Sequence, residues 1–274
     1  MAIRLVHISR YSFLRLIRKF KGALILRFIL DDTSLCLINC HLAAGQSQTL
    51  NRNNDAAAIL ESGMLPAEGH PVARGNTFVG GGDGSMIMDH EICILNGDLN
   101  YRIDTMGRDT VIKAISSANF ERLLERDQLL VSRRRNPGFQ LRGFTESSIT
   151  FAPTYKYDVG SDRYDTSEKH RAPAWCDRIL YRGAGRIKQV QYRRHEIKVS
   201  DHRPVSGTFK MRIKKIQPEK RSIAWNDSVR RFDVIRQKLF SEAKYVFTNP
   251  RLKPNNTNHI LLPAGLPTFE MSLG

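Results

Sequence analysis

A carboxylate and an amide, Asp98 and Asn100, stand two positions apart directly after a short apolar run. If the extended backbone continues, side chains at this spacing point the same way. The carboxylate could then orient a water molecule while the amide donates to a phosphate oxygen, as hydrolysis of a phosphomonoester requires. Asp and Asn also favour capped turns, so this pair by itself leaves a turn and a catalytic site equally open.

A second carboxylate, Asp177, needs a partner, because it lies within the apolar segment 175–180, where an unpaired carboxylate is costly. The candidates are its neighbour Arg178 and His202, which belongs to a separate polar motif. A bond to His202 would fix the imidazole tautomer and favour the charged ring, which suits contact with phosphate. A pair with Arg178 would be structural, and the segment alone does not choose between them.

Basic residues gather in two short stretches, 154–157 and 166–171. Charges of this kind are usually solvated surface groups. In an enzyme that acts on a multiply phosphorylated substrate they would instead hold the phosphates that are not cleaved, with Arg as a bidentate donor and Lys as a point charge. The residues concerned are Lys156, Lys169 and Arg171.

The elements that must position these groups can be predicted from the spacing of apolar residues. The runs 23–30 and 34–41 predict two antiparallel strands joined by a short turn, in a sheet covered on both faces. His41 ends the second run, where catalytic side chains commonly lie. The glycine- and proline-rich segment 61–89 predicts a surface loop and lacks the Gly-Lys-Ser/Thr of a phosphate-binding P-loop. The other elements expected are helices at 46–61, 109–130 and 227–247 and strands at 90–96, 176–181 and 205–213.

The composition describes a basic globular protein. The 274 residues suffice for one sizeable core, and 43 basic against 27 acidic residues give a net charge of +16. This charge favours anionic partners, such as phosphorylated lipid, nucleic acid or an anionic membrane surface, without choosing among them. No stretch approaches the roughly 18–20 apolar residues of a membrane-spanning helix. The helix at 227–247 is basic and amphipathic, so it can lie on an anionic membrane or dock on its own domain or a partner.

The cysteines predict a reducing compartment. Cys36, Cys40, Cys93 and Cys176 form no Cys-x-x-Cys pair, and three of them lie in apolar, strand-like runs. Buried, reduced thiols of a cytosolic protein are the expected state.

Four motifs carry a family resemblance. Residues 97–102 read Gly-Asp-Leu-Asn-Tyr-Arg, residues 172–180 read Ala-Pro-Ala-Trp-Cys-Asp-Arg-Ile-Leu, residues 200–204 read Ser-Asp-His-Arg-Pro, and residues 41–45 read His-Leu-Ala-Ala-Gly. Together they resemble the motifs of the inositol polyphosphate 5-phosphatases. The resemblance implies an α/β (α+β) fold, the four-layer DNase I-like sandwich of two packed β-sheets flanked by helices. The stretches 43–48, 151–156 and 164–169 resemble the family's substrate-recognition segments and favour an inositol phosphatase over a DNase I-like nuclease.

The resemblance also implies an activity and the residues that carry it. The activity is Mg²⁺-dependent hydrolysis of the 5-phosphate of phosphoinositides or inositol polyphosphates. Asp98 would activate water, Asn100 would bind the phosphate, and His202, held by Asp177, would contact the scissile phosphate. The remaining implied residues are His41 at a further catalytic position, Asp201 beside the Mg²⁺, and Tyr155, Lys156, Lys169 and Arg171 in the site for the neighbouring 4-phosphate.

The resemblance fails at the N-terminal end of the chain. The family begins with a strand bearing an Asn and a strand ending in Gln-Glu, whose Glu is the principal Mg²⁺ ligand, and neither has a counterpart here. We therefore expect a basic stump at 1–21, the later two-thirds of the catalytic domain at 22–212, and a basic amphipathic helix with an irregular tail at 213–274. Impaired hydrolysis is the expected consequence.

Several alternatives remain open at this point. The chain could be a fragment, a non-catalytic phosphoinositide-binding relative, or a chain completed by another polypeptide, and a DNase I-like nuclease is the least favoured function. Residues 1–21 are basic and lack acidic residues, which also resembles a mitochondrial transit peptide. The strand-like sequence that follows without a linker favours a truncated domain, and we expect a cytoplasmic protein with peripheral membrane contact.

Overall fold

The computed structural model describes the backbone of residues 3–13 and 21–248, and the side chains of residues 21–242 and 244. The chain divides into two compact units, Met1–Ile216 and Gln217–Gly274. The first unit contains all the predicted site residues. The described part of the second unit is one helix, α6 (Pro218–Thr248), which begins nine residues before the predicted start at 227. The irregular tail expected after this helix lies outside the described residues.

A five-stranded sheet forms the centre of the first unit, with the strands in chain order from one edge to the other. The second strand pairs antiparallel with the first and the third, the third pairs parallel with the fourth, and the fourth pairs antiparallel with the fifth. The predicted hairpin at 23–41 is confirmed. The strands are β1 (Ile3–Phe13), β2 (Lys21–Leu30), β3 (Thr33–His41), β4 (Ile92–Asp98) and β5 (Asp177–Arg182).

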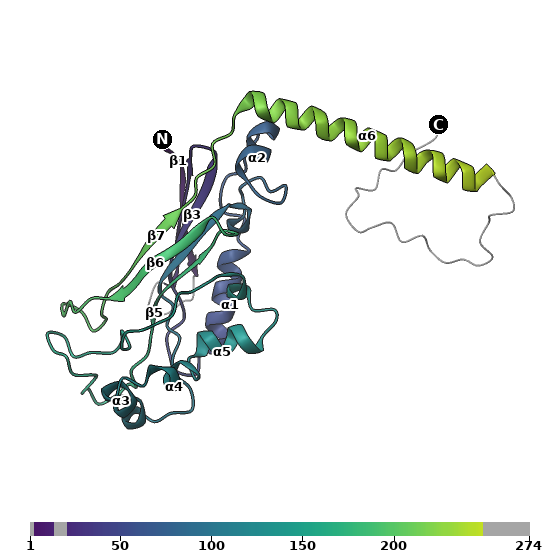
Figure 1. Cartoon of the computed structure of the whole chain (residues 1–274). Helices are drawn as coiled ribbons and strands as arrows, with labels where there is room; N and C mark the ends of the chain where they lie inside the picture. Colours follow the sequence, from purple (N-terminus) through teal and green to yellow (C-terminus); the bar gives the residue numbers. More distant parts are fainter. Residues whose placement is uncertain (1–2, 14–20, 249–274) are drawn as a thin grey trace. The chain divides into compact units, whose positions relative to one another are not determined.

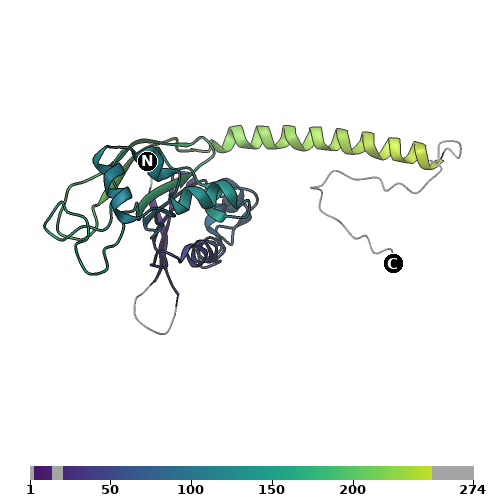
Figure 2. The ribbon, with the colours of Figure 1, turned by 90° about the horizontal axis from the view of Figure 1, so that it is seen from below.

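Both faces of this sheet are covered, as the apolar runs predict. On one face, alternate residues such as Ile25 and Ile38 pack against the helices α1 (Thr49–Leu60) and α5 (Gln128–Arg135), which lie on the same side of the strands in Figures 1 and 2. On the other face, Leu35 and Ile92 pack against a two-stranded antiparallel sheet, β6 (Ile187–Arg194) and β7 (Val205–Met211). Two sheets therefore pack face to face, with helices on the outer side of the larger one.

The helical spacing at 109–130 spans two helices and the start of a third, so the expected single helix is wrong. Helix α3 (Arg108–Ser116) ends where Ala118 takes a positive φ of 52°, and Asn119 then caps α4 (Phe120–Leu124) by accepting a bond from the Arg122 N–H. Helix α5 begins after Asp127, whose carboxylate accepts from the Leu130 N–H. Asn119 and Asp127 each cap the start of a new helix. The spacing of apolar residues alone does not reveal such breaks.

Five further elements were not expected from the sequence. The segment 61–89 contains a short helix, α2 (Pro71–Thr77), and a 3₁₀ turn, η1 (Ile87–Asp89). Strand β6 was not predicted, and another 3₁₀ turn, η2, spans Gln140–Gly143. Within the segment predicted as a basic stump, 1–21, the backbone forms β1 and pairs with β2. The predicted elements at 46–61, 90–96, 176–181 and 205–213 correspond to α1, β4, β5 and β7.

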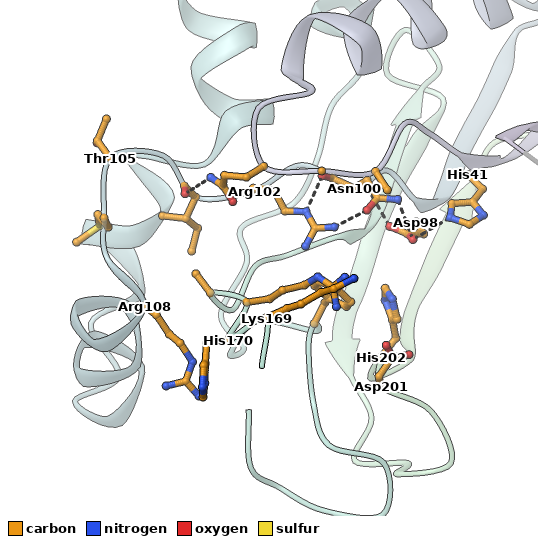
Figure 3. Close-up of a pocket in the computed structure, with 18 of the residues that line it drawn as sticks. His41, Asp98, Asn100, Arg102, Thr105, Arg108, Lys169, His170, Asp201 and His202 are labelled. Atoms are coloured by element: carbon orange, nitrogen blue, oxygen red, sulfur yellow. Dashed lines mark hydrogen bonds and ion pairs between the residues drawn. The ribbon is translucent and has the colours of Figure 1, made fainter. Parts of the chain in front are cut away.

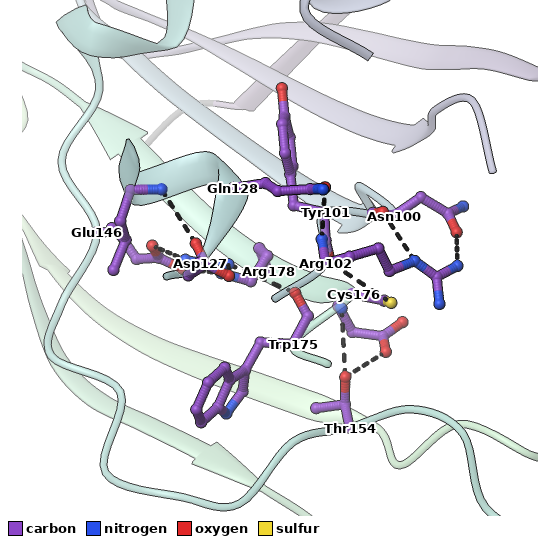
Figure 4. A network of polar contacts seen from close by, with 12 residues as sticks. Asn100, Tyr101, Arg102, Asp127, Gln128, Glu146, Thr154, Trp175, Cys176 and Arg178 are labelled. Carbon is purple, nitrogen blue, oxygen red and sulfur yellow. Dashed lines mark hydrogen bonds and ion pairs between the residues drawn. The ribbon is translucent and has the colours of Figure 1, made fainter. Parts of the chain in front are cut away.

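A buried ion-pair network anchors β5. The Arg178 guanidinium donates to both carboxylate oxygens of Glu146 at 2.7 Å and to Asp127 at 2.9 Å (Figure 4). Burial raises the pKa of Asp127, while the charge of Arg178 opposes that shift. Arg178 is thus occupied by two other carboxylates, and Asp177 must find its partner elsewhere.

Candidate active site

Three strand ends place the central residues of the site in one row. His41, the last residue of β3, is paired in register with Asp98, the last residue of β4. Asp98 is in turn paired with Asp177, the first residue of β5. Residues almost 140 positions apart in the sequence are therefore neighbours at a single edge of the sheet, because parallel and antiparallel pairing both bring these ends together.

Asp98 is held by the motif that contains it. One of its oxygens accepts from the Asn100 backbone N–H at 3.0 Å, and the other accepts from the Asn100 side-chain amide at 3.0 Å and lies 3.2 Å from His41 Nε2. Asn100 has a φ of 57°, a left-handed conformation that Asn tolerates. At Gly97, a Cβ would lie 2.1 Å from the Cys40 carbonyl oxygen. The Gly and Asn of this motif are thus required by the backbone as well as by the chemistry.

The electrostatics of the site keep Asp98 ionised. Burial pushes its pKa upward, but the hydrogen bond with His41 and the nearby charges of His202, His41 and Lys21 outweigh burial and lower it. The other hydrogen of the Asn100 amide is donated to the Leu42 carbonyl at 3.2 Å. Asn100 therefore donates both amide hydrogens to groups of the protein. Its side chain orients the Asp98 carboxylate.

His202 takes Asp177 as its partner, as one of the two sequence alternatives predicts. Its Nδ1 lies 2.9 Å from Asp177 Oδ2, which also accepts from the Thr154 hydroxyl at 2.7 Å. Asp177 therefore bonds to Nδ1, and Nε2 is the other imidazole nitrogen of His202. Burial tends to lower the pKa of His202, but the hydrogen bond and charge of Asp177, with Asp98 and Asp201, raise it above the ordinary value.

One pocket of about 1220 Å³ brings most of the predicted residues together. Figure 3 shows Asp98 between Asn100 and His41, with His202 and Asp201 opposite and Lys169 nearby. The predicted residues that line the pocket are His41, Asp98, Asn100, Tyr155, Lys169, Arg171, Asp201 and His202. Asp177 lies behind His202.

Lys156 is the predicted phosphate-binding residue that does not line this pocket. Its ammonium group lies 3.2 Å from Asp165, which is fully buried and also accepts from the backbone N–H groups of Ser167 and Arg171. Burial opposes ionisation of Asp165, but these bonds hold its pKa well below the ordinary range. Lys156 and Asp165 therefore fix the loop that carries Lys169 and Arg171.

Three basic residues of the pocket were missed by the sequence reasoning: Lys21, Arg102 and Arg108. Arg102 lies inside the 97–102 motif and could have been found there. Lys21 contacts His41, and Arg108 donates to the Tyr164 and Asp165 carbonyls. Neither has a local sequence signal, because each reaches the pocket only through the fold. With Lys169 and Arg171 they give the pocket five strong bases against two carboxylates, which suits a polyanionic ligand.

The donor groups fit a divalent cation. Within the described part of the chain, potential ligand atoms of Asp98, Asp177 and His202 lie within 4.8 Å of one another. Asp177 and His202 are already bonded to each other. Asp98 and Asp201 provide the carboxylates of the pocket itself, and hard cations such as Mg²⁺ prefer oxygen ligands.

Comparison with protein families gives a match to Endonuclease/Exonuclease/phosphatase family 2 over residues 11–208. Among curated proteins, a probable inositol polyphosphate 5-phosphatase of Schizosaccharomyces pombe is 53% identical over 224 residues, which is 81% of this chain and 18% of the relative. The type II inositol 1,4,5-trisphosphate 5-phosphatase of Mus musculus is 41% identical, over 73% of this chain and 19% of its own length. The chain thus spans less than a fifth of either relative.

Among solved structures, the inositol polyphosphate 5-phosphatase domain of SPsynaptojanin, in complex with inositol (1,4)-bisphosphate and calcium ion, matches with a TM-score of 0.66 and 35% identity. The match covers 86% of this chain and 63% of that domain. A Cimex nitrophorin matches with a TM-score of 0.54 at 20% identity and shares the fold alone. The expected DNase I-like fold is confirmed.

Proposed function

The chain belongs to the endonuclease/exonuclease/phosphatase family, among its inositol polyphosphate 5-phosphatases, and on that premise we propose that it hydrolyses the 5-phosphate of inositol polyphosphates or phosphoinositides. The observation that carries the proposal is the convergence of Asp98 and the Asp177–His202 pair in one basic pocket. The neighbouring domain in complex with inositol (1,4)-bisphosphate supports an inositol phosphate as the ligand.

The residues of the pocket suit an in-line displacement. A water oxygen bonds to phosphorus, the bond from phosphorus to the ring oxygen breaks, and that oxygen takes up a proton from solvent water. Asp98, held ionised and oriented by Asn100 and His41, accepts the proton of the attacking water. His202, charged through its bond to Asp177, donates to the phosphoryl group from Nε2. When bound by Asp98 and Asp201, Mg²⁺ would neutralise charge on the phosphoryl oxygens.

The test is a phosphate-release assay with Mg²⁺ on inositol 1,4,5-trisphosphate and on phosphatidylinositol 4,5-bisphosphate, with the product's phosphate positions assigned by NMR. We expect loss of the 5-phosphate. Impaired hydrolysis by the 274-residue chain stays a prediction. Its turnover number in this assay tests that prediction. Tight binding without turnover would support the non-catalytic alternative, and cleavage of an abasic-site duplex would support the nuclease.

Lys169 should recognise the phosphate next to the one that is cleaved. The Lys169→Ala variant is expected to weaken binding of a headgroup with a 4-phosphate by about tenfold or more, because a hydrogen bond to a charged group contributes roughly 1.5–3 kcal/mol. Isothermal titration with inositol 1,4-bisphosphate measures this. Lys188→Ala, an exposed lysine on β6 outside the pocket, is the matched control.

A headgroup that lacks the 4-phosphate should bind the two proteins equally. Equal losses of affinity for both headgroups would show that Lys169 contributes only general charge.

Helix α6 is the surface that we propose for contact with an anionic membrane. Trp225, Phe232 and Phe240 are each more than half exposed, and the helix carries seven basic and four acidic residues. Aromatic side chains with basic neighbours are typical of helices that lie in the membrane interface. No helix in the described part of the chain is both long and apolar enough to span a membrane. The four cysteines are free and buried, which supports a cytoplasmic location.

The membrane proposal predicts that Phe232→Asp lowers binding to phosphatidylserine-containing vesicles severalfold. Truncation after Ile216 should also lower this binding severalfold. Val234→Asp is the matched control, since Val234 is exposed and lies about 200° away around the helix. Sedimentation with vesicles at low and high salt measures both. If the two variants and the truncation all bind as the unmodified chain does, α6 is not the membrane surface.

A further inference from the structure

Arg102 holds the side chain that orients Asp98. Its Nη2 lies 2.6 Å from Asn100 Oδ1, and its Nε lies 3.1 Å from the Asn100 carbonyl oxygen. Arg102 is 6% exposed. Because the guanidinium has donors only, it fixes the amide with its oxygen toward Arg102. The amide hydrogens are thereby directed to Asp98 and Leu42.

The same guanidinium also supports the other half of the site. It lies over the Tyr155 ring, with Cζ 4.4 Å from the ring centroid, and the Tyr155 ring lies 4.6 Å from the His202 ring at an angle of 39°. The Tyr155 backbone is bridged to that of His202 and to that of Ala174. Guanidinium, phenol and imidazole are therefore in consecutive contact, and Asp177 bonds to Nδ1 of that imidazole.

We propose that Arg102 is a positioning residue that joins the two halves of the site, and that the Tyr155 ring transmits its support to His202. The inference rests on the proposed hydrolase function. Through Asn100, Arg102 fixes the direction of Asp98. Through Tyr155, it limits movement of the imidazole. Lysine could not replace it, because an ammonium group lacks the planar surface and the fixed fork of donors that make both contacts at once.

Two other roles predict different behaviour. If Arg102 bound a substrate phosphate directly, its loss would raise KM. The family resemblance implies a place for Tyr155 in the site for the 4-phosphate. If Tyr155 acted there through its hydroxyl, then removal of the hydroxyl would be as harmful as removal of the ring.

The kinetic test compares Arg102→Lys, Tyr155→Phe and Tyr155→Leu on inositol 1,4,5-trisphosphate. Arg102→Lys should lower kcat by about tenfold to a hundredfold, since small displacements of reacting groups have effects of this size, and should change KM by less than about threefold. Tyr155→Phe should keep at least about ten times the kcat of Tyr155→Leu. The double variant Arg102→Lys/Tyr155→Leu should lose much less than the product of the single losses, because the two residues share a contact. Arg142→Lys, an exposed arginine outside the pocket, is the control for general effects.

A rise in KM with unchanged kcat in Arg102→Lys, or equal losses in Tyr155→Phe and Tyr155→Leu, would overturn the inference. If even the unmodified chain shows no turnover, NMR still tests the positioning role. Failure of the proposed hydrolase function can therefore be distinguished from failure of this inference. Arg102→Lys should shift both the Asn100 side-chain amide and the His202 ring signals, whereas Tyr155→Leu should shift mainly the His202 ring. Unshifted signals in Arg102→Lys would refute the positioning role.

Discussion

Replacement of Asp98 with Asn should lower the rate of phosphate release from inositol 1,4,5-trisphosphate by about a hundred- to ten-thousand-fold, the range for loss of a general base. Asn has nearly the same size but cannot accept the proton of the attacking water. It would also lose the attraction that the surrounding cations exert on the carboxylate, since His202 and Lys21 both act on it. Steady-state phosphate release measures the effect.

The control for this prediction is Asp227→Asn, an exposed carboxylate of α6 paired with Arg231. It should leave turnover of the soluble substrate unchanged, and circular dichroism should show both variants folded. A folded Asp98→Asn protein with more than about a tenth of the original rate would remove Asp98 from the role of general base.

Replacement of Arg178 with Met should reduce the free energy of unfolding by about 3–5 kcal/mol, the usual effect of breaking a buried ion pair. The change leaves Asp127 and Glu146 buried without their shared cation, at 0% and 3% side-chain exposure. Chemical denaturation at neutral pH measures the loss. Arg135→Met, at the exposed end of α5, is the matched control and should change stability by less than about 1 kcal/mol.

The pH dependence of this loss gives an independent check. Burial already raises the pKa of Asp127 in the folded protein, and removal of Arg178 would raise it further. An acid with a raised folded pKa binds its proton more tightly when folded than when unfolded, so the folded state gains stability as pH falls toward that pKa. The deficit of Arg178→Met should therefore shrink on acidification. A deficit that grows at lower pH would argue against uncompensated carboxylates as its cause.

The sequence by itself determined the family, the fold class and eight of the residues that line the pocket. It could do so because those signals are local: apolar runs that end in His41 or Asp98, an Asp-x-Asn spacing, and a carboxylate within an apolar strand. The reduced, buried cysteines and the β2–β3 hairpin followed from equally local patterns, and all are present in the structure.

Only the tertiary structure decided how these groups are paired. The register of β3, β4 and β5 aligns His41, Asp98 and Asp177, and register depends on contacts between segments distant in the chain. Arg178 is taken by Asp127 and Glu146, which leaves Asp177 to His202.

The fold also gave some predicted residues partners that the sequence did not indicate, and it brought other residues into the pocket. Lys156 turns to Asp165 instead of lining the pocket, and Asn100 uses its amide on Asp98 and Leu42. Arg102 reaches Asn100 and Tyr155 at once, although 53 positions separate it from Tyr155. A hydrogen-bond donor or a charge in a sequence has many possible partners, and burial in a packed fold selects among them, because each group that loses water must find its partner within reach.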